Sequence, residues 1–408
     1  MLALRTSELV ALPAIQEARR RLEGVAVVTP LDRSRALSER VGGPVFIKCE
    51  NLQRTGSFKI RGAYNLISRL NEGEKKAGVV TASAGNHAQG VALAASLVGA
   101  PATVFMPSSG SIVKAEATRR YGASVELVGK DFGAAADAAT RHADATGSVF
   151  VSAFDHPDII AGQGTLGCEV SEQLDDIGTV VVPVGGGGLI SGVAAALRGL
   201  RDSLRIVGVQ ASGAASFPPS LSCGEPVTLE HMATIADGIA ANRPGDLTFE
   251  HVRSFVDDIV CVSDEAMAEG LVFAAERMKL VLEPAGAAGI AAVLNGLGDL
   301  EPPVVVVLSG GNIDPLLLLR VVRFGLSASG RYFAFRTRMS DRPGELLVML
   351  ELIAELGANI VGIAHHREGL AVDLGEVDVT LQVETKGKGH IEEVAGRLAA
   401  AGYIVEPL

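Results

Sequence analysis

The sequence predicts an α/β protein in which helices cover both faces of a mainly parallel sheet. Short runs of β-branched residues alternate with Ala-rich stretches of helical character along most of the 408 residues, an order typical of βαβ units. Most of these runs are almost continuously apolar, as in strands that are buried on both faces. From about residue 331 the strands alternate instead, which predicts a second and different domain.

The expected elements follow in chain order. The strands of the main part are predicted at Phe46–Glu50, Gly78–Ala82, Thr103–Met106, Val125–Leu127, Val149–Ser152, Val180–Val184, Ile206–Gln210 and Val304–Leu308. The small polar stretch Leu326–Arg331 is expected to be a linker. After it we expect strand Arg331–Arg338, helix Pro343–Leu356, strand Ile360–His366, strand Glu376–Glu384, helix Ile391–Ala401 and strand Tyr403–Val405. This β-α-β-β-α-β order is ferredoxin-like.

Charge and composition exclude several classes of partner. A net charge of −11 makes nucleic acid and anionic membranes poor partners. The longest apolar runs, such as Val304–Leu308, are far shorter than the roughly 20 residues of a membrane span, and residues 1–30 lack the pattern of a signal peptide. The cysteines lie far apart without metal-ligand spacing; they are Cys49, Cys168, Cys223 and Cys261. We therefore expect a cytoplasmic protein with free thiols and no metal site.

The first chemical motif is Ser57-Phe58-Lys59-Ile60-Arg61-Gly62-Ala63, in which Ser57 is expected to cap a helix. By helical spacing, Lys59 shares an apolar face with Ala63, Leu66 and Leu70. Desolvation on such a face lowers the pKa of the amine, and a neutral amine can form an imine with an aldehyde. The alternative is a lysine whose head group reaches water.

The second motif, Ser83-Ala84-Gly85-Asn86-His87, directly follows the strand at Gly78–Ala82. Its small residues leave the backbone N–H groups open where the next helix begins, and such a turn can hold a carboxylate. The alternative is an ordinary turn between a strand and a helix. We expect His87 to pack or cap locally and not to act as a base.

The third motif, Gly185-Gly186-Gly187-Gly188-Leu189, lies between the strand ending at Val184 and a helix. Consecutive glycines let the backbone wrap an anion, and the helix N-terminus adds positive potential. The motif has neither the P-loop lysine nor the spacing of dinucleotide folds, so a small phosphorylated cofactor is expected. The alternative is a flexible turn.

The fourth motif, Ser309-Gly310-Gly311-Asn312, follows the strand Val304–Leu308, and its serine hydroxyl can meet a ring nitrogen. Glu283 lies between two helical stretches, where capping a helix is favoured over facing the site. Three of the four loops follow the carboxyl ends of strands, which is where open α/β sheets bind ligands.

Together, SFKIRGA, SAGNHAQG, GGGGL and SGGN resemble the serine/threonine dehydratase family of fold-type II pyridoxal-phosphate enzymes, over about residues 5–325. The segments Ala236–Ile239 and Val256–Val260 resemble it too. The resemblance implies a two-lobed, tryptophan synthase β-like catalytic domain over residues 1–325, with a smaller lobe at about 50–150. It implies a threonine dehydratase activity that yields 2-oxobutyrate and ammonia, a parallel reaction from serine to pyruvate, and a place in isoleucine biosynthesis.

The resemblance also implies a role for each motif. Lys59 would be the Schiff-base lysine and Phe58 would lie beside the ring of pyridoxal 5'-phosphate. Asn86 would meet the pyridine hydroxyl, Ser309 the ring nitrogen and Gly185–Leu189 the phosphate. The turn formed by Ser83, Ala84, Gly85, Asn86 and His87 would hold the substrate carboxylate.

The tail, residues 331–408, resembles an ACT domain, an amino-acid-binding regulatory module. The resemblance implies a homo-oligomer, a dimer or a tetramer, with isoleucine or valine as the effector. The turn Asp341–Glu345 and the segment Gly357–Ile360 are the expected effector site. The alternative is a domain that only builds the oligomer.

The alternative within this reaction type is an L-serine dehydratase, and three other functions are disfavoured by the residues. A serine racemase would need a serine where this chain has Ala84, and its cation site an acidic residue where this chain has Gln210. A sensor without catalysis would not need Lys59. Cysteine-synthase-like enzymes share the fold but have a different substrate loop and no such tail.

Overall fold

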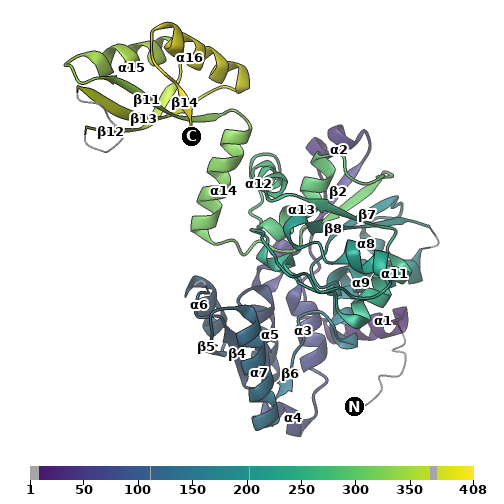
Figure 1. Ribbon diagram of the computed structural model, residues 1–408. Coiled ribbons are helices and arrows are strands. Elements are labelled where there is room, and N and C mark those ends of the chain that lie inside the picture. The colour runs from purple at the N-terminus through teal and green to yellow at the C-terminus, as the bar shows by residue number, and fades with distance from the viewer. Residues whose placement is uncertain (1–8, 111, 202, 368–374) are drawn as a thin grey trace. The chain divides into compact units, whose positions relative to one another are not determined.

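The computed structural model describes residues 9–110, 112–201, 203–367 and 375–408. The chain forms two compact units, one ending at Pro315 and the other beginning at Leu316 (Figure 1). Residues 1–8 of the expected catalytic domain lie outside the described residues. None of the described helices is long and apolar enough to cross a membrane.

The first unit contains a six-stranded sheet in the order β1-β2-β10-β7-β8-β9. Its strands are β1 Leu31–Arg33, β2 Val45–Lys48, β7 Thr179–Pro183, β8 Arg205–Ala211, β9 Asp258–Val262 and β10 Val304–Val307. All neighbouring pairs are parallel except β1 with β2. Every residue of β7 and β10 is buried, so burial on both faces is confirmed for these strands.

A second, four-stranded parallel sheet in the order β5-β4-β3-β6 forms a smaller lobe of the same unit. Its strands are β3 Val79–Ala82, β4 Ala102–Met106, β5 Ser124–Leu127 and β6 Val149–Phe150. The α/β prediction is therefore confirmed, with β1 and β9 as strands that the apolar runs did not reveal.

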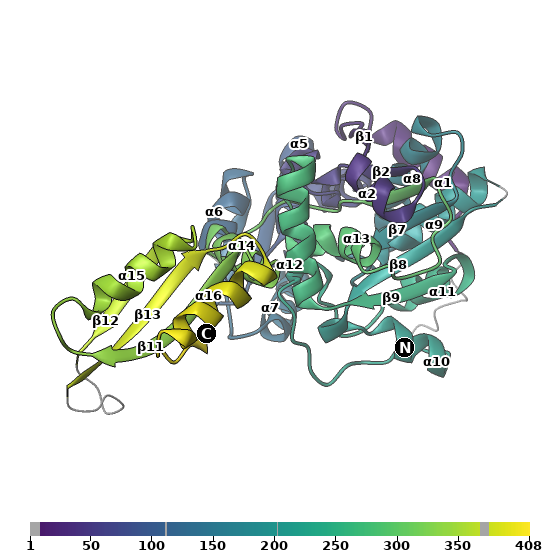
Figure 2. The same ribbon diagram turned by 90° about the horizontal axis from the view of Figure 1, so that it is seen from above.

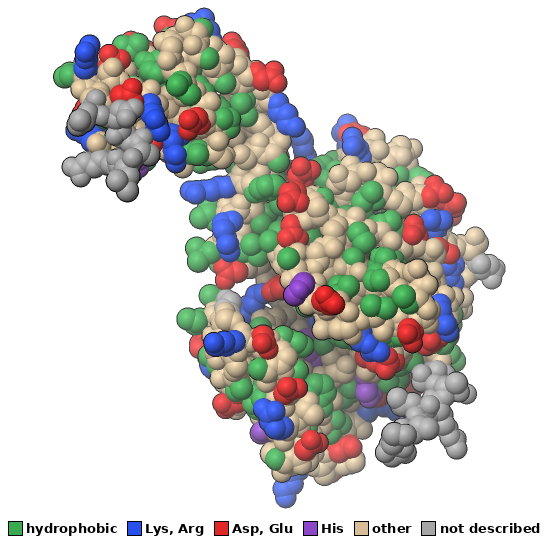
Figure 3. Space-filling view, in the orientation of Figure 1, with side chains coloured by type: hydrophobic (Ala, Val, Ile, Leu, Met, Phe, Trp, Pro, Cys, Tyr) green, Lys and Arg blue, Asp and Glu red, His purple; other side chains and the backbone are tan. Residues whose placement is uncertain are grey.

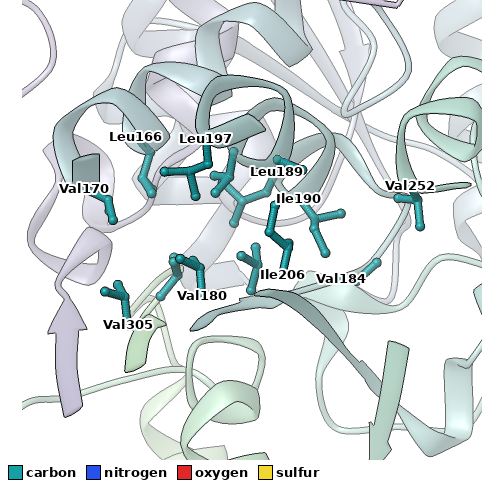
Figure 4. Close-up of a cluster of buried hydrophobic side chains, with 14 of the residues drawn as sticks. Leu166, Val170, Val180, Val184, Leu189, Ile190, Leu197, Ile206, Val252 and Val305 are labelled. Atoms are coloured by element: carbon teal, nitrogen blue, oxygen red, sulfur yellow. The ribbon is translucent and has the colours of Figure 1, made fainter. Parts of the chain in front are cut away.

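Helices cover both sheets of the first unit (Figure 1). They are α1 Leu12–Arg21, α2 Arg35–Val41, α3 Lys59–Ile67, α4 Glu72–Ala77, α5 Asn86–Val98, α6 Ile112–Arg120, α7 Phe132–Thr146, α8 Pro157–Gln173, α9 Gly188–Leu200, α10 Phe217–Cys223, α11 Asp246–Phe255, α12 Asp264–Phe273 and α13 Pro284–Leu294. In the main core, Leu166 of α8 and Leu197 of α9 pack with Val180, Ile206 and Val305 of the sheet (Figure 4). This core fixes the strand ends from which the functional loops emerge.

The surface of the first unit is mixed in charge. On the face shown in Figure 3, basic side chains are interspersed with acidic ones. The four cysteines are free thiols: Cys49, Cys168, Cys223 and Cys261.

The second unit follows the predicted β-α-β-β-α-β order. Its elements are β11 Tyr332–Ser340, α15 Glu345–Glu355, β12 Asn359–His366, β13 Glu376–Glu384, α16 Lys388–Ala400 and β14 Glu406–Pro407. The strands form an antiparallel sheet in the order β12-β13-β11-β14. Alternate residues such as Phe335 and Leu381 are buried with Met349 and Leu398 of the two helices, which run along one face of the sheet (Figure 1 and Figure 2).

Two element boundaries that we predicted from the sequence were wrong. The expected linker Leu326–Arg331 begins inside helix α14 Pro315–Ala328, because the apolar run Leu316–Leu319 and the residues after it continue as a helix up to the turn at Gly330. The last strand lies at Glu406–Pro407 and not at Tyr403–Val405, because α16 runs to Ala400 and the chain then turns through Gly402.

Candidate active site

Three of the sequence motifs meet in the first unit. Ser57 and Gly310 pair as an isolated antiparallel bridge, and the Phe58 N–H donates to the Ser309 carbonyl at 3.2 Å. The Asn312 amide nitrogen donates to Asn86 Oδ1 at 2.8 Å. Segments far apart in the sequence are thus brought into contact at the candidate site.

Lys59 is the first residue of α3 and is only partly exposed. Its Nζ donates to the Ala153 carbonyl at 2.9 Å and lies 5.1 Å from the centre of the Phe58 ring. Loss of hydration lowers the pKa of Lys59 to about 8. Because α3 ends at Ile67, Leu70 is not on the helical face expected for it. A lysine with this pKa is partly neutral near pH 8 and can act as a nucleophile or a base.

The glycine motif forms a loop with unused donors. Gly187, at φ +99°, precedes helix α9, and the N–H groups of Gly185–Leu189 have no acceptor among the described residues. A Cβ on Gly186 would lie 2.5 Å from the Phe154 ring, so the tight packing requires glycine. The Leu189 side chain is buried in the core, so only its backbone is available to a ligand. Such a loop is suited to an anion.

Glu283 faces the site, contrary to the capping role favoured from sequence. It precedes α13, but its carboxylate caps no N–H of that helix. Instead, Oε1 accepts a 2.5 Å hydrogen bond from the Asn86 amide. Burial, followed by the nearby Asp237 carboxylate, raises the pKa of Glu283 to about 7. The carboxyl group therefore gains or loses a proton near neutral pH.

Comparison with known proteins decides the family. Residues 22–310 match the family model described as pyridoxal-phosphate dependent enzyme. The chain belongs to this family. Its cofactor is therefore pyridoxal phosphate, as the motifs predicted.

Several members of the pyridoxal-phosphate dependent enzyme family are similar over most of their length. An L-threonine ammonia-lyase from Thermotoga maritima is 48% identical over 397 residues, which span 97% of this chain and 99% of the relative. The structure of the processed form of threonine deaminase isoform 2 from Solanum lycopersicum has a TM-score of 0.73 at 35% identity, covering 79% of this chain and 93% of that one. Maize serine racemase has a TM-score of 0.72 at 36% identity, with coverage of 78% and 98%.

The residues present fit the cofactor of this family. The unpartnered N–H groups of Gly185–Leu189 suit its phosphate, and the lowered pKa of the Lys59 amine suits a reaction with its aldehyde. Ser309 is buried, and its hydroxyl makes only a 3.4 Å contact with the Ala285 carbonyl. That hydroxyl is therefore free to meet a stronger partner, such as a ring nitrogen.

The turn Ser83–His87 has one buried member. The Ser83 hydroxyl accepts from the Gly85 N–H at 3.2 Å, and Asn86 begins α5, which leaves Ala84 part-exposed. The His87 ring is buried against the Val151 carbonyl at 3.0 Å, and burial lowers its pKa to about 3. The local packing expected for His87 is confirmed, and its ring stays neutral.

Ser57 does not cap α3. It has extended backbone angles, Phe58 takes the cap position without a side-chain bond, and the buried Ser57 Oγ has no hydrogen-bond partner. The reason is the bridge to Gly310, which holds Ser57 in an extended conformation. Ser57 thus stands one residue before the cap position of α3.

A buried ion network next to Lys59 was missed. Arg61 contacts Glu50 at 2.8 Å and Glu169 at 2.7 Å, and Lys48 contacts Glu169 at 2.7 Å. All four side chains are at most 7% exposed. The signal in the sequence was charge inside apolar segments, such as Lys48 at the end of the Val45–Lys48 strand. The network ties α3 to α8 and β2, and so holds the helix that begins at Lys59.

Proposed function

We propose that this chain is a threonine ammonia-lyase that converts L-threonine to 2-oxobutyrate and ammonia, and L-serine to pyruvate. The observation that carries the proposal is that one unit combines Lys59, an amine with a pKa of about 8, and a glycine loop of unpartnered N–H groups. The full-length similarity to an L-threonine ammonia-lyase supports the choice of substrate.

Each residue of the site then has a task. Lys59 holds the cofactor and takes the Cα proton of the substrate. Gly185–Leu189 would bind the phosphate through backbone N–H groups, Ser309 would meet the ring nitrogen, and Phe58 would lie beside the ring. Asn86 meets the pyridine hydroxyl. The bound cofactor supplies an electron sink for the pair left when the Cα proton departs.

The Ser83–His87 turn would bind the substrate carboxylate, since the open N–H groups at the start of α5 attract an anion. His87 contributes only its backbone there, because its ring is occupied by Val151. Glu283 can hold a proton at Asn86 near pH 7, beside the position proposed for the pyridine hydroxyl.

Two residues favour elimination over racemisation. Ala84 stands on the substrate loop and has no proton to give to the second face of the substrate. Ser309 is a neutral partner for the ring nitrogen and cannot keep it protonated as a carboxylate would. Expulsion of the 3-hydroxyl then relieves the negative charge at Cα.

The second unit is the regulatory part of this proposal. Residues 1–325 are the catalytic domain, with a smaller lobe at about 50–150, and residues 331–408 are an ACT domain. Helix α15 begins after Gly344, at φ +99°, without a side-chain cap. Its first N–H, that of Glu345, donates to the Arg342 carbonyl at 3.3 Å, but the next two N–H groups have no acceptor among the described residues. These two N–H groups can take the carboxylate of isoleucine or valine. Binding of this effector would change the affinity for threonine. Allosteric coupling between two binding sites is typically about 1–3 kcal/mol, or about 5–150-fold in affinity.

The proposal includes a cytoplasmic homo-oligomer, a dimer or a tetramer, in isoleucine biosynthesis. Threonine saturation curves with and without isoleucine or valine test the regulation. We expect at least one of the two to shift the curve. If neither does, the tail is not a branched-chain amino-acid sensor.

The activity itself is tested with a panel of amino acids. Purified enzyme should release 2-oxobutyrate from L-threonine and pyruvate from L-serine, with one ammonia per 2-oxo acid. Release from neither would refute the proposal, and D-serine formed from L-serine as fast as pyruvate would favour a racemase instead.

A further inference from the structure

A threonine outside the sequence motifs, Thr248, contacts a backbone carbonyl of the glycine loop Gly185–Leu189. Thr248, in α11, is fully buried, and its hydroxyl lies 2.6 Å from the Gly186 carbonyl and 3.2 Å from the Gly245 carbonyl. The Gly245 N–H adds a longer contact of 3.4 Å to the same Gly186 oxygen. The Gly186 carbonyl is thus held from the α11 side.

Holding this carbonyl sets the direction of a donor. In a trans peptide, the carbonyl and the N–H of the next residue point in opposite directions. When Thr248 fixes the Gly186 carbonyl, the N–H of Gly187 points away from α11. That N–H has no acceptor among the described residues, so it is available to an anion.

Asp155 holds Thr248 in place. Its Oδ1 accepts from the N–H groups of Leu247 at 3.0 Å and Thr248 at 3.1 Å, and its Oδ2 from Asp246 at 3.1 Å. The carboxylate therefore satisfies the first turn of α11, where a negative charge is also favoured by the helix dipole. A Cβ on Gly245 would lie 2.3 Å from Asp155 Cγ, so glycine is required for this approach.

The same short segment reaches Lys59. The Ala153 carbonyl accepts from Lys59 Nζ. The Phe154 ring lies where a Cβ on Gly186 would stand, and the Phe154 backbone and Cβ lie within 3.0 Å of where a Cβ on Gly188 would stand. Residues 153–155 thus contact the lysine, the loop and the cap of α11 in sequence.

From these contacts we infer that Thr248 and Asp155 are positioning residues for the cofactor phosphate: they orient the Gly186–Gly187 peptide so that its N–H faces the phosphate. The inference rests on the proposed function, which assigns Gly185–Leu189 to that phosphate. It predicts that Thr248 matters for binding the phosphate and not for the aldehyde chemistry at Lys59.

The test measures binding to the apoenzyme with two ligands, pyridoxal phosphate and pyridoxal, which lacks the phosphate. Thr248→Val keeps the shape of the side chain and removes the hydroxyl. We expect this variant to bind pyridoxal phosphate roughly tenfold more weakly, as loss of one well-placed buried hydrogen bond does. Its affinity for pyridoxal should stay within about twofold of that of the wild type. Thr248→Ser restores the hydroxyl and should restore the affinity.

Thr179→Val is the matched control. Thr179 is equally buried and begins β7, at the opposite end of the strand that leads into the glycine loop. Its hydroxyl donates to the Glu301 carbonyl at 3.0 Å. Thermal unfolding of each apoenzyme reports the general cost of losing a buried hydroxyl, and Thr179→Val should keep wild-type affinity for both ligands.

The outcomes separate this inference from the proposed function. If wild type binds pyridoxal as tightly as pyridoxal phosphate, the assignment of the loop to the phosphate fails. If wild type prefers pyridoxal phosphate and Thr248→Val keeps the full preference, only the positioning role fails. The positioning role also fails if Thr248→Val loses affinity for both ligands equally. It fails too if Thr179→Val loses as much affinity for pyridoxal phosphate as Thr248→Val does.

Discussion

Two lysines of the first unit, Lys48 and Lys59, are both withdrawn from water, and their partners differ. Lys48 is fully buried and donates to the Thr29 carbonyl at 2.8 Å, Glu169 at 2.7 Å and Gln173 at 2.9 Å. Lys59 donates to one backbone carbonyl and has no carboxylate in contact among the described residues. A charge with several partners is structural, whereas an unpaired amine is available for chemistry.

The pKa values follow the same difference. Burial lowers the pKa of both lysines, but for Lys48 the attraction of Glu169, its hydrogen bond and the Glu50 charge all act in the opposite direction. For Lys59 the charge of Glu283 opposes the effect of burial, and its pKa lies at about 8. The comparison therefore predicts that substitutions at Lys59 change catalysis, whereas those around Lys48 change stability.

The largest expected effect is the loss of turnover in Lys59→Ala. Under the proposed function, the variant lacks both the amine that would hold the cofactor and the base that would take the Cα proton, so ammonia release from threonine should fall by at least about a thousandfold. Circular dichroism should show an intact fold. Near wild-type activity would refute the assignment.

The next effect concerns the ion network. Arg61→Ala leaves the buried Glu50 carboxylate without its cation and leaves Glu169 with Lys48 alone, and we expect the free energy of unfolding to fall by about 3–5 kcal/mol. Arg35→Ala is the control, because its pair with Glu39 is exposed and should contribute less than about 1 kcal/mol. Denaturant titrations measure both, and equal losses would contradict a special role for the network.

A smaller effect is expected in the pH dependence of stability. The pKa of Glu283 is about 7 in the folded protein, against 4.5 for an unperturbed group. Between these values the folded state holds the extra proton, so this group makes the apoenzyme less stable as the pH rises from about 4.5 to about 7. Glu283→Gln should flatten that part of the curve in denaturant titrations; an unchanged slope would contradict the raised pKa.

The smallest effect is expected on the second face of the substrate. Ala84→Ser introduces a hydroxyl on the substrate loop, and we expect slow formation of D-serine from L-serine while pyruvate remains the main product. Chiral chromatography after long incubation measures it. If wild type forms as much D-serine as Ala84→Ser, Ala84 is not what prevents racemisation.

The sequence was most informative where a pattern has one physical meaning. Continuous apolar runs revealed buried strands such as β7 and β10, and clustered glycines revealed the loops behind them. It singled out Lys59 by its motif but did not reveal the ion pair of Lys48, because the partner Glu169 comes from a distant part of the chain.

Other roles depended on contacts that no local pattern encodes. Glu283 has the sequence context of a helix cap, and only its approach to Asn86 shows otherwise. Thr248 is an ordinary residue in the first turn of a helix until the fold places it against Gly186. The apolar stretch ahead of the expected linker belongs to α14, and the small residues after it gave no sign of where that helix ends.

The central claim, that Lys59 and not Lys48 carries the cofactor, has a direct measurement. Borohydride reduction of the holoenzyme fixes pyridoxal phosphate to the lysine that holds it, and peptide mass spectrometry then locates the added mass. We predict the label on the peptide that contains Lys59 and none on Lys48. A label on Lys48 or any other lysine, with Lys59 unmodified, would contradict the account.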